Sequence, residues 1–370
     1  MWFRNNGTKR LKGLTQISIR IYNCDAFGKR DCLHRDFHVT LLSEGWVGHW
    51  SSPIVAQKVT TSACVRRCVG LLFSVCMAMG LCKAQDLAPR AYVITALHSN
   101  AVTLTWNYYN GGINLGGTIP VAGATGTYSV PIFTYYHSFG FFGRSANITA
   151  SLPYGVGTFQ GDVLGRGVQV YRSGLLDLAV RFSVNLKGGP AMEPRQYVKW
   201  HQKVLLGASL KVIAPTGQYD SHKLINWSIN RWAFKPEFGY SQRWGHWILD
   251  GYAGVWFYTT NNAFFDIHVP RRQTEAPIGS LEGHLSYDFK PRLWASLDGN
   301  FWFGGTTALN GISNPGTRQT NSRIGGTVSI PITKHQSLKF SYNNGTYIRF
   351  GGNYQNVSAA WQYSWLGKPK

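Results

Sequence analysis

The chain has 370 residues, of which 37 are Lys or Arg and 16 are Asp or Glu, so its formal net charge is +21. This excess suggests nucleic-acid binding, but the basic residues are scattered singly between apolar ones, without a basic helix or a finger-like spacing. All six cysteines precede Gln85, which excludes a disulfide framework or a thiolate metal site in the rest of the chain.

Residues 1–63 show no sustained apolar period, and they mix Cys, His, Arg and Trp without a pattern. We therefore expect a non-native or disordered N-terminal extension, translated from a start codon that is set too early. Initiation near Val65 would then give the native chain. The alternative is a genuine long extension or a small cytosolic segment.

Residues 64–84 have the three parts of a secretory signal peptide. Two arginines precede the apolar residues 68–82, and a small-x-small cleavage site ends at Ala84. The apolar run is shorter than the ~20 residues that a membrane-spanning helix needs. We predict a signal peptide over residues 64–84 and a mature protein over residues 85–370, with a buried core helix as the alternative.

Apolar and polar residues alternate in several segments from about residue 100 onward. In residues 176–187, apolar side chains occupy one face, and Asp177 and Arg181 share the other, where we expect them in one layer. A period of two places successive side chains on opposite faces, so each such segment predicts a strand. The predicted strands begin near residues 100, 127, 145, 174, 200, 231, 246, 278, 292, 321, 337 and 355.

A soluble β-sandwich also alternates, so the length of the strands and the aromatic residues decide the fold. The strands have about ten residues, which tilted membrane-spanning strands require. Aromatic residues make up 14% of the chain and gather near strand ends, as in the aromatic girdles of membrane barrels. The expected girdle residues are Trp244, Trp247, Trp256, Phe257, Tyr258, Phe301, Trp302, Phe303, Trp361, Tyr363 and Trp365.

Short and long connections alternate along the chain. Tight turns are expected at residues 141–144, 243–246, 289–292 and 333–336, with longer polar segments between them. Only residues 188–199 form a long connection where a short one is expected. The pattern predicts an all-β fold, a transmembrane up-and-down antiparallel β-barrel of about 12 strands, with its short turns facing the periplasm.

Seven segments of residues 85–366 also carry a family resemblance. They are QDLAPRAY, FFGRSANITASLPYG, SGLLDLAVRFSVNL, ASLKVIAPTGQYD, NRWAFKPEFG, LWASLDGNFWFGG and TNSRIGGTVSIPI. In this order they resemble the bacterial family described as "putative MetA-pathway of phenol degradation", whose members are often called transporters. The resemblance implies an outer-membrane barrel, and its cargo would be aromatic or other hydrophobic compounds.

Charged residues on the inward face of the strands would set the properties of the lumen. Alternation places inward Asp177, Arg181, Lys203, Lys211, Lys235, Glu237, Asp250, Glu282, His284, Asp298, Arg323, Lys339 and Arg349. Those within family-like segments are the candidate lumen or transport residues: Asp177, Arg181, Lys235, Glu237, Asp298 and Arg323. Because both signs occur, a paired network that plugs the lumen is favoured over a solvated wall that guides a substrate.

Motifs for catalysis are weak. His-x-Ser occurs only at residues 335–337, in a predicted turn rather than on the lipid-facing strand of a membrane phospholipase. The glycine-rich segments lack the ending of a phosphate loop, and the histidines lack a metal-binding spacing. We expect no enzymatic activity, no catalytic residue, no cofactor and no metal.

These observations predict a passive outer-membrane transporter or channel for small molecules in a Gram-negative bacterium. The first alternative is a closed structural or surface-binding membrane protein with a plugged lumen, and the second is a membrane-embedded hydrolase. The expected partners are the lipid bilayer with its lipopolysaccharide, the outer-membrane assembly machinery and an unidentified small-molecule cargo. Nucleic acid is not an expected partner.

Overall fold

The computed structural model describes residues 87–115, 121–163, 165–265, 269 and 271–367, together with the backbone of four strands within residues 3–48. The chain forms two compact units, Met1–Ser62 and Ala63–Lys370. The predicted signal peptide, residues 64–84, lies outside the described residues, so it remains a prediction.

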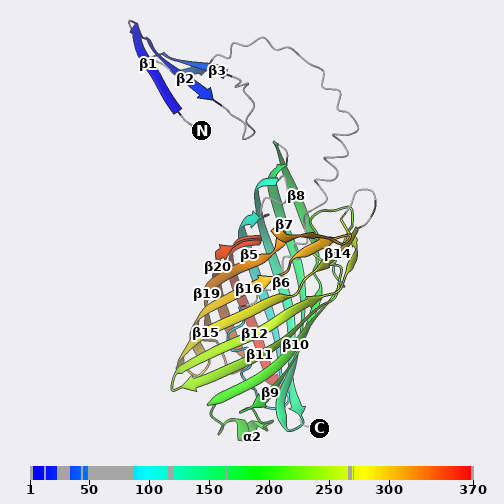
Figure 1. Cartoon of the computed structure of the whole chain (residues 1–370). Coiled ribbons are helices and arrows are strands. Elements are labelled where there is room, and N and C mark those ends of the chain that lie inside the picture. The colour runs from blue at the N-terminus through cyan, green and yellow to red at the C-terminus, as the bar shows by residue number, and fades with distance from the viewer. Residues whose placement is uncertain are drawn as a thin grey trace. The chain divides into compact units, whose positions relative to one another are not determined.

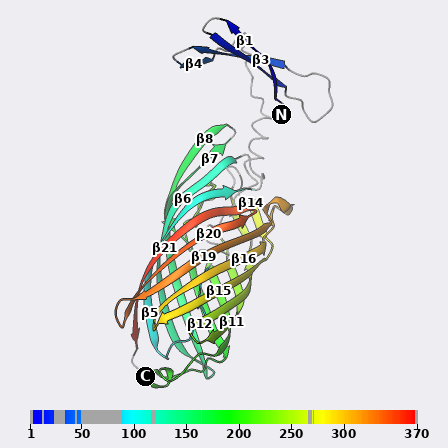
Figure 2. The ribbon, with the colours of Figure 1, turned by 90° about the vertical axis from the view of Figure 1, so that its left-hand side faces the viewer.

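The N-terminal unit contains a four-stranded antiparallel sheet whose strands follow one another in chain order (Figure 2). They are β1 (Phe3–Leu11), β2 (Leu14–Tyr22), β3 (His34–Leu42) and β4 (Gly45–Gly48). The alternation of Ile17, Ile19 and Ile21 within β2 is the strand signal that the sequence analysis overlooked. The expectation of a non-native or disordered extension with a start codon set too early remains a prediction.

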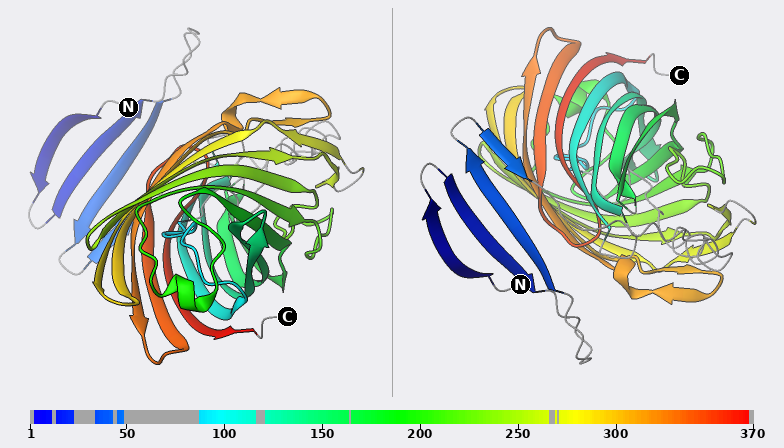
Figure 3. Two further views of the ribbon diagram at one scale, coloured as in Figure 1. Left: turned by 90° about the horizontal axis from the view of Figure 1, so that it is seen from below. Right: turned by 90° about the horizontal axis from the view of Figure 1, so that it is seen from above.

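In the second unit, twelve antiparallel strands of the described residues close into a barrel (Figure 1). They are β5 (Ser99–Asn114), β6 (Val121–Phe141), β7 (Arg144–Val163), β9 (Leu178–Lys187), β10 (Val204–Ala214), β11 (Ala233–Trp244), β12 (Trp247–Tyr258), β15 (Ile278–Lys290), β16 (Leu293–Gly304), β19 (Gln319–Pro331), β20 (Gln336–Ile348) and β21 (Gly351–Leu366). Pairing of β21 with β5, from Gly351 opposite Asn114 to Leu366 opposite Ser99, closes the ring that Figure 3 shows from both ends. The predicted barrel of about 12 strands is confirmed.

The two ends of the barrel differ in their connections. At the turn end, short turns join β6 to β7, β11 to β12, β15 to β16 and β19 to β20, and residues 188–203 form the expected long connection, which contains α2 (Pro194–Tyr197). The loop end carries longer connections with β8 (Arg166–Leu175), β13 (Asn261–Phe264), β14 (Arg271–Glu275), β17 (Thr307–Leu309), β18 (Ile312–Asn314) and the 3-10 helix η1 (Pro315–Thr317). Among the described residues, no helix is both long enough and apolar enough to span a membrane.

Strand β8 pairs only with β7, and together they form a hairpin that rises beyond the other strands in Figure 1. The sequence analysis expected one strand from about residue 174. The structure instead has β8 ending at Leu175 and β9 beginning at Leu178, because the backbone between them turns away from the ladder to meet the loop after β10. The remaining strands begin within a few residues of the predicted positions.

The outside of the barrel is apolar and the inside is polar. In β15, Leu281 and Leu285 are 50% and 38% exposed, whereas Glu282 and His284 between them are 6% and 1% exposed. A strand with this alternation places its apolar face toward lipid and its polar face toward the lumen. The alternation of buried and exposed positions recurs along most of the barrel strands, as a membrane-spanning barrel requires.

Aromatic residues on the outside lie near both ends of the strands, as expected for girdles. Exposed aromatic side chains include Trp106, Phe141, Phe142, Trp232, Trp244, Trp247, Phe257, Phe289, Phe303 and Tyr347. Three predicted girdle residues, Trp256, Tyr258 and Trp302, are wrong. Trp256 and Trp302 are each 1% exposed and face the lumen, and Tyr258 stacks on Trp256 and packs against the same inward cluster. Their neighbours Phe257 and Phe303 take the outward positions, so the two tryptophans pack with Ile278 inside the barrel.

Candidate functional site

Residues 87–98, which we call the lumen segment, run inside the barrel. The Ala91 N–H donates to the Tyr252 hydroxyl at 3.0 Å, and the Tyr92 side chain is only 1% exposed. Because the next strand, β5, begins at Ser99 at the turn end, the lumen segment enters from that end. The sequence analysis did not foresee it, since these residues show no strand alternation.

Tyr92 fills a notch in the barrel wall made by two glycines. Gly207 of β10 and Gly239 of β11 face each other in the ladder, and a Cβ atom at either position would lie 2.2 Å from the Tyr92 ring. The Tyr92 hydroxyl lies 3.0 Å from Ser209 Oγ and donates to Glu237 Oε1 at 3.0 Å. Glycine is required at both positions, because a side chain would expel the ring from the wall.

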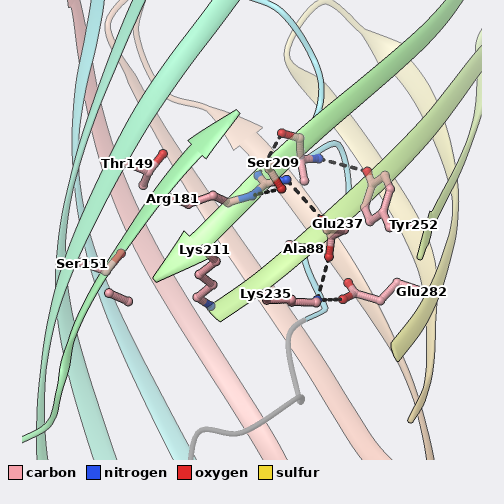
Figure 4. Close-up of a pocket in the computed structure, with 12 residues that line it drawn as sticks. Ala88, Thr149, Ser151, Arg181, Ser209, Lys211, Lys235, Glu237, Tyr252 and Glu282 are labelled. Carbon is pink, nitrogen blue, oxygen red and sulfur yellow. Dashed lines mark hydrogen bonds and ion pairs between the residues drawn. The ribbon is translucent and has the colours of Figure 1, made fainter. Parts of the chain in front are cut away.

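Charged side chains from β9, β11 and β15 meet at one place on the lumen wall (Figure 4), and Glu237 among them accepts from the Tyr92 hydroxyl. Lys235 Nζ lies 2.6 Å from Glu237 Oε2 and 2.9 Å from Glu282 Oε1. The Arg181 guanidinium lies 3.3 Å from Glu237 Oε1, and it also donates to Ser209 Oγ at 3.1 Å. Each carboxylate thus has a cation at contact distance, which offsets the cost of burying both.

The ion pairs continue along β15 and onto the adjacent strand β16. His284 Nδ1 lies 2.9 Å from Asp298 Oδ1, and His284 Nε2 lies 3.7 Å from Glu282 Oε2. The Thr327 hydroxyl donates to Asp298 Oδ2 at 2.8 Å. We call the connected set Arg181, Lys235, Glu237, Glu282, His284 and Asp298 the charge network.

A cavity of about 230 Å³ lies against the charge network. Its wall combines Arg181, Lys211 and Lys235 with the carboxylates of Glu237 and Glu282, and the lumen segment closes one side with its alanines (Figure 4). Such a wall can hold a small polar molecule or ordered water. The described lining contains hydroxyl groups, but none is paired with a histidine that would activate it as a nucleophile.

Asp177 lies outside the charge network, at the loop end of β9. Its carboxylate accepts hydrogen bonds from the Gly217 N–H at 2.9 Å, the Ser228 hydroxyl at 2.7 Å and the Ile229 N–H at 2.8 Å. The expectation that Asp177 and Arg181 share one lumen layer is therefore wrong. Asp177 instead fixes residues 215–232, the loop that joins β10 to β11.

Arg323 is also separate from the charge network. It lies on β19, is 1% exposed, and donates from Nη1 to Asn343 Oδ1 at 3.1 Å. Its surroundings are aromatic, because Tyr128 and Tyr354 pack in a cluster near it. The structure thus brings four of the six candidates together and places Asp177 and Arg323 elsewhere.

Two further inward predictions are wrong. Lys203 is exposed just before β10, where the ladder has not yet begun. Arg349 is exposed just after β20, because a register shift between Ser322 and Arg323 changes which residues of β20 face inward. Ile348 consequently takes the inward position that the unbroken alternation assigned to Arg349.

The loop half of the lumen is filled by an aromatic cluster that the sequence analysis missed. Trp227 of the 215–232 loop is 5% exposed and packs against Tyr128 and Phe159, with ring centroids 5.9 Å apart in both cases. A Cβ atom at Gly155 would lie 2.5 Å from the Trp227 ring. The alternating glycines of β7 were a usable signal, because they mark a wall position that receives a large ring.

The sequence profile of the family described as "Putative MetA-pathway of phenol degradation" matches residues 110–367. The chain belongs to this family. No protein among the curated sequences matches it. The match covers every barrel strand except the first part of β5, and it includes all six candidate residues.

Solved structures of outer-membrane barrels are similar to this member of the phenol-degradation family to different degrees. The COG4313 outer membrane channel from Pseudomonas putida F1 is 15% identical, with a TM-score of 0.63 over 76% of this chain and 100% of that one. The β domain of the Bordetella autotransporter BrkA is 13% identical, with a TM-score of 0.43 over 72% of this chain and 100% of that one. The first comparison shows that the chain shares its barrel fold with an outer membrane channel.

Proposed function

We propose that this family member is an outer-membrane channel through which small molecules diffuse passively. The observation that carries the proposal is the lumen itself, which polar and charged side chains line inside an apolar exterior. A barrel built only as a lipid-facing scaffold has no need of buried lysine, arginine and glutamate. The shared fold with an outer membrane channel and the family's association with transport support the same function.

The proposed cargo is an aromatic or otherwise hydrophobic small molecule. The family description refers to phenol degradation, and the loop half of the lumen is lined by rings, among them Tyr128, Phe159, Trp227 and Tyr354. Stacked and edge-on ring contacts stabilise a passing aromatic compound as they stabilise one another. The chemistry at the lumen is therefore binding and passage rather than bond cleavage.

A second candidate function is a closed membrane protein whose loops alone bind partners. The observation that favours it is the filling of the lumen by Tyr92 and the aromatic cluster, together with the paired charge network. Paired charges within a narrow barrel hold its walls together. The two functions differ in one measurable property, the passage of ions.

Conductance in planar lipid bilayers tests the proposal. The barrel, purified from membranes, should give a small single-channel conductance, and Tyr92→Ala should increase it severalfold because the ring no longer occupies the lumen. Tyr342→Ala, which removes an aromatic side chain 49% exposed on the outside, is the matched control and should leave conductance unchanged. Absence of conductance in both the wild type and Tyr92→Ala would favour the closed protein.

Three further parts of the proposal concern the cell. We propose that residues 64–84 direct export and are removed, and that the assembly machinery recognises the aromatic residues of the last strand, including Tyr363 and Trp365. The turn end faces the periplasm and the longer loops face lipopolysaccharide. Detection of residues 1–63 on the barrel purified from membranes would contradict the processing step.

A further inference from the structure

We propose that Arg323 binds the carboxylate of a small aromatic acid that enters the lumen from the loop end. This inference rests on the proposed channel function and names a substrate class for it.

Arg323 differs from the other buried cations of the lumen in its partners. Lys235 contacts two carboxylates, and Arg231 near the loop end pairs with Glu275. In the described part of the chain, no carboxylate lies within ion-pair distance of Arg323, although its side chain is 1% exposed. A buried charge without a counter-charge is costly, so the site favours any anion that can reach it.

The unused donors of Arg323 have the geometry of a carboxylate site. Nη1 donates to Asn343, whereas Nε and Nη2 have no hydrogen-bond partner among the described residues. Nε–H and Nη2–H lie on one edge of the planar guanidinium, the edge that binds both oxygens of a carboxylate. The site therefore matches a carboxylate better than a spherical anion.

A chain of amides holds the guanidinium in this orientation. The Asn343 side chain accepts from Arg323 and donates to Asn356 Oδ1 at 3.0 Å, and Asn356 in turn donates to the Tyr108 carbonyl at 3.3 Å. Three neighbouring strands thus fix the arginine before any ligand binds. Such preorganisation strengthens binding, because little side-chain freedom is lost on association.

Rings near the guanidinium would select the rest of the ligand. Tyr109 stacks on Tyr128 with centroids 4.7 Å apart, and Tyr128 meets Tyr354 edge-on at 5.1 Å. All three phenol groups lie near the Arg323 guanidinium, and the Tyr354 hydroxyl has no hydrogen-bond partner among the described residues. An aromatic ring attached to the carboxylate would pack within this cluster.

A cavity of about 900 Å³ at the loop end provides access to the cluster. Trp227 forms part of the cavity wall, and its ring also packs on Tyr128, so this side chain belongs both to the cavity wall and to the aromatic cluster. The cavity wall contains Arg172 and Lys223 together with Asp220. A ligand that moves from the cavity toward Arg323 would therefore pass the indole of Trp227.

Direct binding to the full chain in detergent tests the proposal by titration calorimetry with benzoate, acetate and phenol. Wild type should bind benzoate more tightly than either acetate or phenol, because only benzoate carries both the carboxylate and the ring. Arg323→Met should weaken benzoate binding at least about tenfold, since hydrogen bonds to a charged group are lost. Arg323→Lys should restore part of the affinity, and Lys290→Gln, an exposed change at the turn end, should leave it unchanged.

Other outcomes would overturn the proposal. Equal benzoate affinity in wild type and Arg323→Met would remove Arg323 from the site, and equal affinity for acetate would remove the aromatic selectivity. A purely structural arginine would lower the unfolding temperature of Arg323→Met without a difference between benzoate and acetate in wild type. Conductance of the same preparations distinguishes failure of the Arg323 site from failure of the channel function. Ion passage without benzoate binding rejects the Arg323 site alone, and benzoate binding without ion passage rejects the channel function.

Discussion

The two walls of the lumen differ in the kind of polar side chain that they bury. On the charged wall, β9 to β16, acids and bases pair within and between strands in the charge network. On the neutral wall, formed by β19 to β21 and β5 to β7, Arg323 is a buried cation, and most of the other buried polar groups are amides and hydroxyls, among them Asn107, Asn147, Ser329, Asn343, Asn356 and Ser358. Paired charge therefore holds one wall together, whereas neutral hydrogen-bonding groups line most of the other.

The largest expected effect comes from breaking the charged wall at Lys235. Lys235→Met leaves Glu237 and Glu282 without their shared cation, which should lower the free energy of unfolding by about 3–5 kcal/mol. Urea unfolding of the purified barrel measures the loss. Ser341→Ala on the neutral wall is the control and should change stability by less than about 0.5 kcal/mol. Similar losses in both variants would show that the walls do not differ.

A smaller effect is expected where the walls meet. The Thr327 hydroxyl of β19 donates to Asp298 of β16, so Thr327→Val removes one hydrogen bond to a charged acceptor while the shape of the side chain is kept. We expect a loss of about 1.5–3 kcal/mol in the same unfolding assay. A double variant with Asp298→Asn should lose less than the sum of the single losses, and strict additivity would contradict the contact.

Lys339 on the neutral wall should affect selectivity more than stability. It is exposed within the lumen, and it forms no ion pair with the described residues. Lys339→Gln should change the free energy of unfolding by less than about 1 kcal/mol. In a KCl gradient, the reversal potential should move toward cations, because one positive charge leaves the path. An unchanged reversal potential would place the ion path along the charged wall.

The smallest effect concerns pH at the loop end, outside both walls. The His222 N–H and the Lys223 side chain hydrogen-bond to the Asp220 carboxylate and lower its pKa below the ordinary 3.8. Because the pKa of Asp220 is lower in the folded loop than in the unfolded chain, the ionised carboxylate stabilises the folded loop at pH values above the unfolded pKa. This stabilisation is lost as the pH falls through the folded pKa. Hydrogen exchange of residues 216–229 should therefore increase slightly below about pH 4. Asp220→Asn should abolish that dependence, and an identical response in this variant would contradict it.

Local pattern predicted most of the barrel and part of its site. Alternation predicted where the strands begin and which faces of β11 and β15 turn inward, because a period of two has only two possible facings. That logic failed at Arg349, where the register shift opposite Arg323 reversed the facing without a mark in the sequence. It also failed at Trp302, because aromatic residues near strand ends occur on both faces.

Contacts between distant segments were beyond the reach of local pattern. Tyr92 lies in the lumen because two glycines far along the chain leave space for its ring, and Trp227 lies there because Gly155 does the same. A glycine in a strand indicates that another group packs closely against the backbone there, but it does not identify which residue that is. Asp177 shows the same limit, since its partners belong to a loop of irregular backbone.

The closure of β21 onto β5 also constrains how the molecule is made. Ser99 pairs with Leu366, so the ring is complete only after the last strand has been synthesised, and such distant pairing folds slowly. The lumen segment precedes β5 and already needs its contacts with β10, β11 and β12 inside the ring. Tyr92 can bind to an open sheet of these strands before β21 pairs with β5. Assembly would then proceed from the middle of the barrel outward to its two terminal strands.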